Sequence, residues 1–156
     1  MIFLQSCASI EQKSVITKPP QSIPNAWQTS GRLGVEFSNK SQNAGFEARF
    51  DGSNYQLILT TALGLGRLEI AFKNGRLQVD SEPISKSFKA WMLGKIHWYF
   101  PIYELGKIAF NRPFESSEWR LQIISRQTNG LPKIIRLIHR SKNIKIKLIF
   151  QNISLI

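Results

Sequence analysis

Strict alternation of apolar and polar residues is the feature of this sequence that most constrains its fold. From Gly31 onward, apolar side chains recur at every second position in short runs, as in Leu33, Val35 and Phe37. Successive side chains of a β-strand point to opposite faces, so this period predicts strands with one buried and one exposed face. The eight predicted strands centre on Val35, Ala48, Leu57, Ile70, Leu77, Leu121, Leu137 and Ile146.

Polar turns make three of the four connections between the first five predicted strands. Residues 38–43 and 51–54 are rich in Ser, Asn, Asp and Gly, so each range predicts a turn. The pair Asn74-Gly75 lies between two alternating runs, and this dipeptide is the strongest short-range signal for a β-hairpin. The first five strands are therefore expected to be antiparallel neighbours.

The period changes after Pro83, where two short helices are predicted. Residues 85–94 carry apolar side chains at helical spacing between a candidate N-cap, Ser85, and a candidate stop, Gly94. A second helix is predicted from Pro101. Its apolar stripe consists of Ile102, Leu105, Ile108 and Ala109. The link between the two helices, residues 96–100, is unusually aromatic.

A chain of 156 residues with 42% hydrophobic residues is long enough for one domain with a sizeable core. An antiparallel sheet of about eight strands usually curls into a barrel or a sandwich. Its inward-facing aromatic residues then either fill an ordinary core or, if helices only partly cap a barrel, leave an apolar cavity for a hydrophobic ligand. Charged residues and glycines interrupt every apolar run well before about 18 residues, so no membrane-spanning helix is predicted.

The net charge of +11 is concentrated in the second half of the chain. Residues 1–80 hold 8 basic and 6 acidic residues, whereas residues 81–156 hold 13 and 4, and no Asp or Glu follows Glu118. Such a surface either binds an anionic partner or is simply a solvated basic face. One alternative function is therefore a basic β-barrel that binds nucleic acid, although the phase of the aromatic residues predicts burial.

Catalysis and metal binding have little support in the sequence. His97 and His139 lie far apart, and Asp51 and Asp80 lie in or beside turns. No group of His, Cys, Asp and Glu has metal-ligand spacing. No catalytic residue, metal ligand or cofactor is therefore assigned, and the protein is not expected to be an enzyme.

The single cysteine, Cys7, ends the run Leu4-Gln5-Ser6-Cys7, which is similar to a bacterial lipobox. Only six residues precede it, fewer than a signal peptide needs. The start is therefore placed too late or an upstream part is missing, unless Cys7 is a chance cysteine in a frayed terminus. Residues 8–25 are polar, contain three prolines and show no periodicity, which is typical of an extended tether.

Three segments carry recognisable motifs. Residues 27–35 hold a tryptophan and a Gly-Arg strand start, residues 44–50 an aromatic second strand, and residues 55–64 an apolar third strand with a Leu-Gly loop. Together these segments resemble the LolB family of outer-membrane lipoprotein receptors. Shorter matches lie at residues 93–94, 100–105 and 131–134. The similarity covers most of residues 27–150. Ala62 replaces the usual proline, and residues 107–110 lack the usual tryptophan.

The resemblance implies a mainly β fold, a single antiparallel incomplete β-barrel with a short helical lid inserted midway. Residues 1–7 would be the remnant of a lipoprotein signal peptide, residues 8–26 a flexible tether and residues 27–156 the half-barrel domain. An acylated Cys7 would anchor a monomer to the outer membrane, facing the periplasm. The protein would accept lipoprotein acyl chains from a soluble carrier of the LolA type and pass the lipoproteins into outer-membrane lipid, without a cofactor.

Three groups of site residues follow. Leu63, with Leu65 beside it, falls at the position that the family uses to insert cargo into the membrane. Strand positions of one phase and one stripe of the first helix are expected to wall the acyl-chain cavity: Val35, Phe37, Phe46, Phe50, Leu57, Leu59, Leu68, Phe88, Trp91 and Met92. A basic surface is expected to face an anionic membrane or an acidic carrier: Arg140, Lys142, Lys145 and Lys147.

Overall fold

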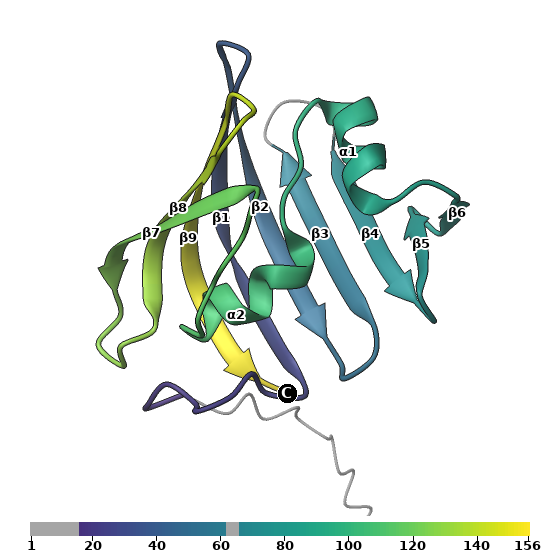
Figure 1. The fold of residues 1–156 in the computed structure, drawn as a ribbon. Helices are drawn as coiled ribbons and strands as arrows, with labels where there is room; N and C mark the ends of the chain where they lie inside the picture. The colour runs from purple at the N-terminus through teal and green to yellow at the C-terminus, as the bar shows by residue number, and fades with distance from the viewer. Residues whose placement is uncertain (1–15, 62–65) are drawn as a thin grey trace, which may run out of the picture.

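The computed structural model describes residues 16–61 and 66–156, and its main element is one curved antiparallel sheet (Figure 1). The described strands lie in the order β6-β5-β4-β3-β2-β1-β9-β8-β7. Their bounds are β1 Trp27–Phe37, β2 Lys40–Phe50, β3 Tyr55–Thr61, β4 Arg67–Lys73, β5 Arg76–Val79, β6 Glu82–Ile84, β7 Trp119–Arg126, β8 Pro132–His139 and β9 Ile144–Leu155. Because β6 and β7 end the sheet without pairing with each other, the barrel is incomplete, which confirms the predicted fold class.

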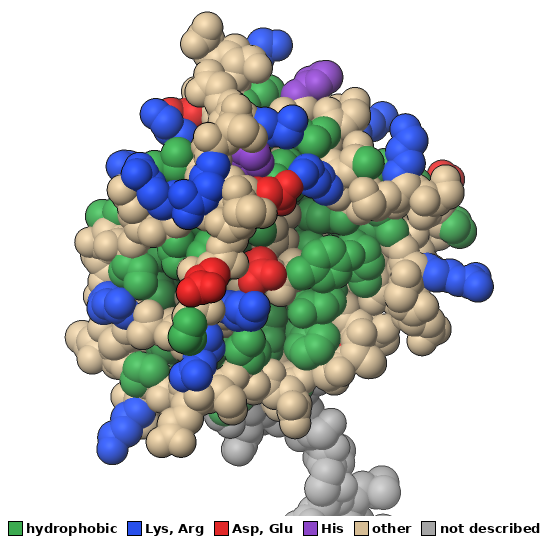
Figure 2. All heavy atoms as spheres, in the orientation of Figure 1, with side chains coloured by type: hydrophobic (Ala, Val, Ile, Leu, Met, Phe, Trp, Pro, Cys, Tyr) green, Lys and Arg blue, Asp and Glu red, His purple; other side chains and the backbone are tan. Residues whose placement is uncertain are grey.

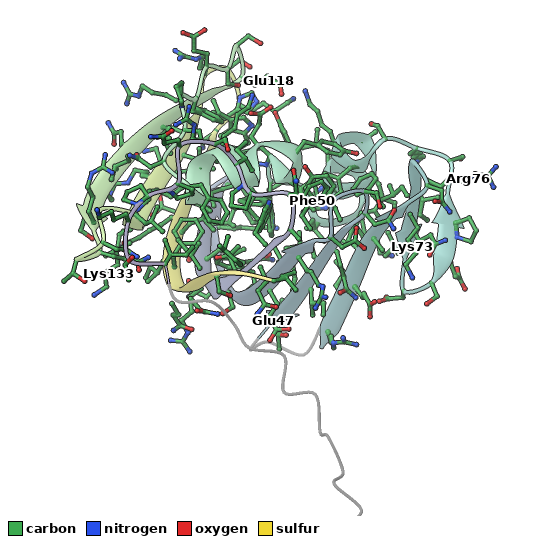
Figure 3. The ribbon with its side chains drawn as sticks, turned by 90° about the horizontal axis from the view of Figure 1, so that it is seen from below. Glu47, Phe50, Lys73, Arg76, Glu118 and Lys133 are labelled. Carbon is green, nitrogen blue, oxygen red and sulfur yellow. The ribbon has the colours of Figure 1, made fainter. Side chains whose placement is uncertain are left out.

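All the described helices lie between β6 and β7 in the chain: α1 (Phe88–Ile96), the 3₁₀ turn η1 (Ile102–Glu104) and α2 (Leu105–Ala109). They lie on the concave side of the sheet (Figures 1 and 3). Figure 3 shows Phe50 pointing to that side and Glu47, three residues earlier, pointing away from it. None of these helices has the length and apolar character needed to cross a membrane.

Two of the predicted turns had different outcomes. Asn74 and Gly75 form the hairpin between β4 and β5 with φ of 53° and 73°, which confirms the prediction from the Asn-Gly pair. The six-residue turn predicted at residues 38–43 is wrong. Only Ser38 and Asn39 turn, with φ of 45° and 61°, and β2 begins at Lys40, paired with Phe37. The polar residues 40–43 belong to β2 and pair with the end of β1. They can be polar because this part of β2 has no buried side chain.

The first helix starts and ends later than predicted. Ser87 rather than Ser85 is the N-cap, and its Oγ accepts a hydrogen bond of 3.2 Å from the Ala90 N–H. The helix continues through Gly94 to Ile96 and ends where His97 takes the left-handed conformation, with φ of 68°. The N–H of His97 then donates to the Met92 carbonyl, which satisfies the last turn without a glycine.

The core lies between the concave face of the sheet and α2. Along β1, Leu33, Val35 and Phe37 are buried and alternate with more exposed residues, as the two-residue period predicts. The helical stripe Ile102, Leu105, Ile108 and Ala109 is also buried. Gly31, beside a register shift in the β1–β9 pairing, allows the two strands to approach, because a Cβ there would lie 1.9 Å from the Ile149 carbonyl oxygen.

Residues 16–26 lie along the end of the sheet where β9 finishes (Figure 1). Ile16 and Ile23 pack against the core, and the Asn129 side chain donates a 3.0 Å hydrogen bond to the Ile16 carbonyl. The second half of the predicted tether is therefore in contact with the domain.

Candidate functional site: an apolar cavity beside helix α1

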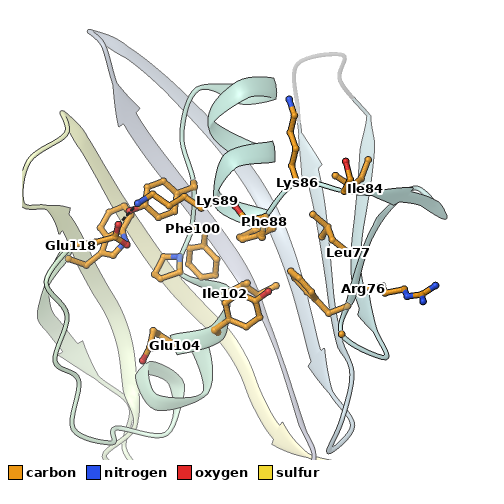
Figure 4. A pocket seen from close by; sticks show the side chains of 18 of the residues that line it. Arg76, Leu77, Ile84, Lys86, Phe88, Lys89, Phe100, Ile102, Glu104 and Glu118 are labelled. Atoms are coloured by element: carbon orange, nitrogen blue, oxygen red, sulfur yellow. Dashed lines mark hydrogen bonds and ion pairs between the residues drawn. The ribbon is translucent and has the colours of Figure 1, made fainter.

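A cavity of about 790 Å³ lies between β4, β5 and β6 on one side and α1 and η1 on the other (Figure 4). In the orientation of Figure 1, the space-filling view shows a broad apolar patch to the right of centre, in this region (Figure 2). The volume falls within the range of about 300–1,000 Å³ that is usual for small-molecule pockets.

Most of the cavity wall is apolar. Leu77, Phe88 and Ile102 are buried residues that present part of their side chains to the cavity, whereas Phe72 and Ile84 are only half-buried. These residues come from β4, β5, β6, α1 and η1, so the wall is assembled from the edge of the sheet and both helical segments. Tyr103, 54% exposed, and Arg76 lie at the solvent-facing part of the lining.

The other end of the cavity is polar. Lys89 of α1 forms an ion pair with Glu118, which directly precedes β7 (Figure 4). The Lys89 Nζ also lies 5.0 Å from the centre of the Tyr99 ring. Tyr99 Oη in turn lies 2.8 Å from Nε2 of the buried His139. We call Lys89, Tyr99, Glu118 and His139 the polar cluster.

Hydrogen bonds fix the protonation of His139. Its Nδ1 accepts the backbone N–H groups of Lys142 at 2.9 Å and Ser141 at 3.2 Å. The proton of the neutral ring is therefore on Nε2, which donates to the Tyr99 hydroxyl. The turn between β8 and β9 is thus connected through His139 and Tyr99 to the cavity.

The polar cluster perturbs the pKa values of its own members. Burial lowers the pKa of His139, and the charges of Lys142 and Lys89 act in the same direction against Glu118. The pKa of Glu118 is lowered chiefly by its hydrogen bond with Lys89. Burial and the neighbouring Glu118 carboxylate raise the pKa of Tyr99. At neutral pH the cluster therefore holds one cation, one anion, a neutral imidazole and a neutral phenol.

An apolar wall with one polar end suits a ligand that is itself mainly hydrocarbon. Burial of each methylene group contributes about 0.8 kcal/mol, so several methylene groups suffice for useful affinity. Across the described ranges, no cluster of three or more His, Cys, Asp or Glu residues could hold a metal ion.

The chain is similar to known proteins in sequence and in fold. The family model described as "Outer membrane lipoprotein LolB" matches residues 25–115. The chain belongs to the LolB family. Two similar curated proteins are outer-membrane lipoproteins LolB of Francisella tularensis subsp. tularensis, from strain WY96-3418 (27% identical) and strain FSC 198 (30% identical). Each alignment covers 115 residues, 65% of this chain and 55% of the relative, so the chain spans about half the length of these relatives.

A solved structure supports the fold of this LolB-family chain. The crystal structure of a LolA superfamily protein from Nitrosomonas europaea superposes with a TM-score of 0.53 at 10% sequence identity. The alignment covers 84% of this chain and 86% of the other. The shared architecture extends well beyond the residues that the family model matches.

Of the ten residues predicted to wall an acyl-chain cavity, only Phe88 lines the cavity beside α1. The other nine pack in or against the hydrophobic core: Val35, Phe37, Phe46, Phe50, Leu57, Leu59, Leu68, Trp91 and Met92. The reason is that other side chains fill the space before the central strands. Phe110, for example, follows α2 and packs on Trp27 with ring centres 6.0 Å apart. A role for the nine residues in holding an acyl chain stays a prediction.

The sequence contains a signal for some of the residues that were missed. Tyr99 and Phe100 belong to the aromatic link between the helices, and both line the cavity. Leu77 and Phe72 have the inward phase of their strands. Glu118 and Lys89 carry no pattern that distinguishes them from other surface charges, and only the structure brings them together.

The remaining predicted site residues lie elsewhere. Lys145 and Lys147 are exposed on β9, and Arg140 and Lys142 are exposed at the turn before it. Cys7, Leu63 and Leu65 lie outside the described residues. The aromatic side chains that a nucleic-acid-binding barrel would need for stacking, such as Phe37, Phe46 and Trp119, are buried.

Proposed function

We propose that this LolB-family protein receives lipoproteins by taking their acyl chains into the apolar cavity beside α1, and then delivers them to a membrane. The observation that carries the proposal is an apolar cavity of about 790 Å³ at the open edge of an incomplete barrel. The related proteins named outer-membrane lipoprotein LolB support the outer membrane as the site of action. The role is one of binding and transfer and requires no catalytic group.

In this proposal Cys7 is acylated and anchors the protein to the outer membrane, facing the periplasm. Residues 1–7 then contain the end of a signal peptide, and the residues up to 26 connect the anchor to the domain. Mass spectrometry of protein expressed from its full reading frame tests the anchor. A Cys7 without lipid would contradict it and leave the cavity unaffected.

Delivery is assigned to Leu63, with Leu65 beside it, in the connection between β3 and β4. We expect Leu63→Glu to leave acyl binding intact and to block transfer, because a carboxylate carried toward hydrocarbon costs about 3 kcal/mol. The assay measures the transfer of lipoprotein from a loaded carrier to liposomes. Asn143→Glu, in the exposed β8–β9 turn, is the matched control. Normal transfer by Leu63→Glu would overturn this assignment, and loss of acyl binding would assign Leu63 to the core.

The basic surface of Arg140, Lys142, Lys145 and Lys147 is proposed to attract an acidic soluble carrier of the LolA type or the anionic membrane surface. Each exposed charge near such a surface contributes up to about 1 kcal/mol at low salt. Replacement of all four residues by Gln should slow association and flatten its dependence on salt, as measured by stopped-flow mixing. Unchanged rates would mean that the charges only solubilise the protein.

A further inference from the structure

The two ends of the sheet differ in how well they could accept another strand. β6 is only three residues long and contains Pro83, which has no N–H to donate. β7, at the other end, has eight residues, and among the described segments it pairs with β8 alone. Every second residue of such an edge directs its N–H and C=O groups away from the sheet. β7 is therefore the edge that could be extended.

A groove of about 580 Å³ runs beside this edge, between β7 and the segment that leads into it from α2. Its apolar lining includes Ile108, Phe114, Leu121 and Ile123. Leu121 and Ile123 are half-buried and lie on the concave face of β7, so their apolar surface is only partly covered. We call this the β7 groove.

The β7 groove adjoins the cavity, because Ser116 and Trp119 line both of them. A ligand whose hydrocarbon part occupies the cavity could therefore continue past Ser116 and Trp119 into the groove.

The positive charge of the β7 groove favours an acidic ligand. Arg112, Arg120 and Arg140 line it together with one acid, Glu115. No acidic side chain of the described ranges forms an ion pair with these three arginines. Figure 2 shows Lys and Arg side chains spread over the β7–β8 side of the molecule. Pairing of β7 with β7 of a second copy would bring like charges together and is disfavoured. An acidic strand would be attracted.

Near the end of β7, some groups lack the pairing partners that strands normally have. The pairing with β8 shifts register around Ser125, and Ile124 has no partner in β8 and is 48% exposed. Ser125 Oγ is buried and has no hydrogen-bond partner among the described residues. A strand added at this edge would bring backbone groups with which such an atom can bond.

We propose that the β7 edge binds the extended peptide segment that follows the lipid-modified residue of a cargo lipoprotein, and that it prefers acidic segments. The inference rests on the proposed function, because it requires acyl chains in the cavity. The peptide would add as a strand to β7, with alternate side chains directed toward the β7 groove. Cargo recognition would thus combine lipid burial with pairing to the polypeptide itself.

The test compares three synthetic probes that carry the same diacylglyceryl-cysteine. One has no peptide, one has an Ile-Glu alternating peptide of about ten residues, and one has the matching Ile-Lys peptide. We expect the Ile-Glu probe to bind about tenfold more tightly than the lipid alone, and the Ile-Lys probe to gain nothing. Hydrogen exchange should show protection of the β7 amides only with the Ile-Glu probe.

Charge reversal by Arg112→Glu with Arg120→Glu should transfer the preference to the Ile-Lys probe. Lys40→Glu with Lys73→Glu is the matched control, because both lysines are exposed and line neither the cavity nor the β7 groove. Equal affinities for all three probes, or a control that reverses the preference equally well, would overturn the inference. If the lipid without peptide fails to bind, the proposed function itself is wrong, so the two failures are distinguishable.

Discussion

The two halves of the concave face carry the same alternating pattern and have different fates. In the half formed by β8 and β9, Leu137, Ile146 and Leu148 have no exposed surface, and Phe110 after α2 is equally buried. In the half formed by β4, β5 and β6, Phe72 and Ile84 are half-buried around the cavity. We refer to these as the packed half and the open half. The alternating pattern therefore determines which face of the sheet turns inward, but not whether other side chains pack against that face.

Matched Leu→Ala substitutions should reveal the largest difference between the packed half and the open half, in the free energy of unfolding. Leu137→Ala in the packed half removes contacts and leaves a new void, so we expect it to lower the free energy of unfolding by about 4–5 kcal/mol. Leu77→Ala enlarges a cavity that already exists, so the loss should be close to the transfer free energy alone, about 2 kcal/mol. Urea unfolding measures both. Equal losses would mean that the two halves are equally well packed.

Filling the open half should reduce ligand binding with little effect on stability. Ile84→Trp on β6 places a larger side chain where Ile84 lines the cavity, and should weaken binding of a fluorescent acyl probe about tenfold. Gln78→Trp on β5 is the control, because Gln78 alternates with the buried Leu77 and Val79 and does not line the cavity. A similar loss in both variants would indicate a general disturbance of the edge strands.

The polar cluster lies where the two halves meet, and it should give a smaller, pH-dependent effect. The folded pKa of His139 is lowered, so between that pKa and about 6.5 the unfolded chain binds more protons than the folded one. Stability supplied by the neutral ring is therefore complete above about pH 6.5 and is lost as the pH falls toward the folded pKa. His139→Gln should flatten the pH dependence of the unfolding midpoint in this window.

Glu118 provides the contrast for that experiment. Its pKa is also lowered, from a lower ordinary value of about 4.3, so its contribution is lost only in more acidic solution. Glu118→Gln should therefore not flatten the pH dependence of the midpoint between about pH 5 and 7. It removes a carboxylate that opposes the lowering of the His139 pKa, so that pKa stays lowered. If Glu118→Gln flattens the pH dependence between about pH 5 and 7 and His139→Gln does not, then Glu118 rather than His139 is responsible for it.

Much of the fold could be predicted because its signals are local. The two-residue period depends only on neighbouring positions, and Asn74-Gly75 requires a left-handed turn whatever surrounds it. The helix cap was missed because Ser85 and Ser87 are chemically equivalent, and only the packing of Phe88 against Phe72 selects the second.

The cavity itself could not be predicted from the alternation because its position depends on tertiary packing. Val35 and Leu77 both face inward, but the space before Val35 is filled and that beside Leu77 is not. The ion pair of Lys89 and Glu118 joins residues on separate elements, and neither residue stands out among the charged positions of the chain.

The most direct test of the account is to locate a bound acyl chain. A fatty-acyl probe with a photoreactive diazirine is bound to the full-length protein, activated by light and located by mass spectrometry of the cross-linked peptides. We expect cross-links only in the open half, within residues 72–77, 84–89 and 99–104, and their loss in Ile84→Trp. Cross-links concentrated in residues 131–150 of the packed half would contradict it.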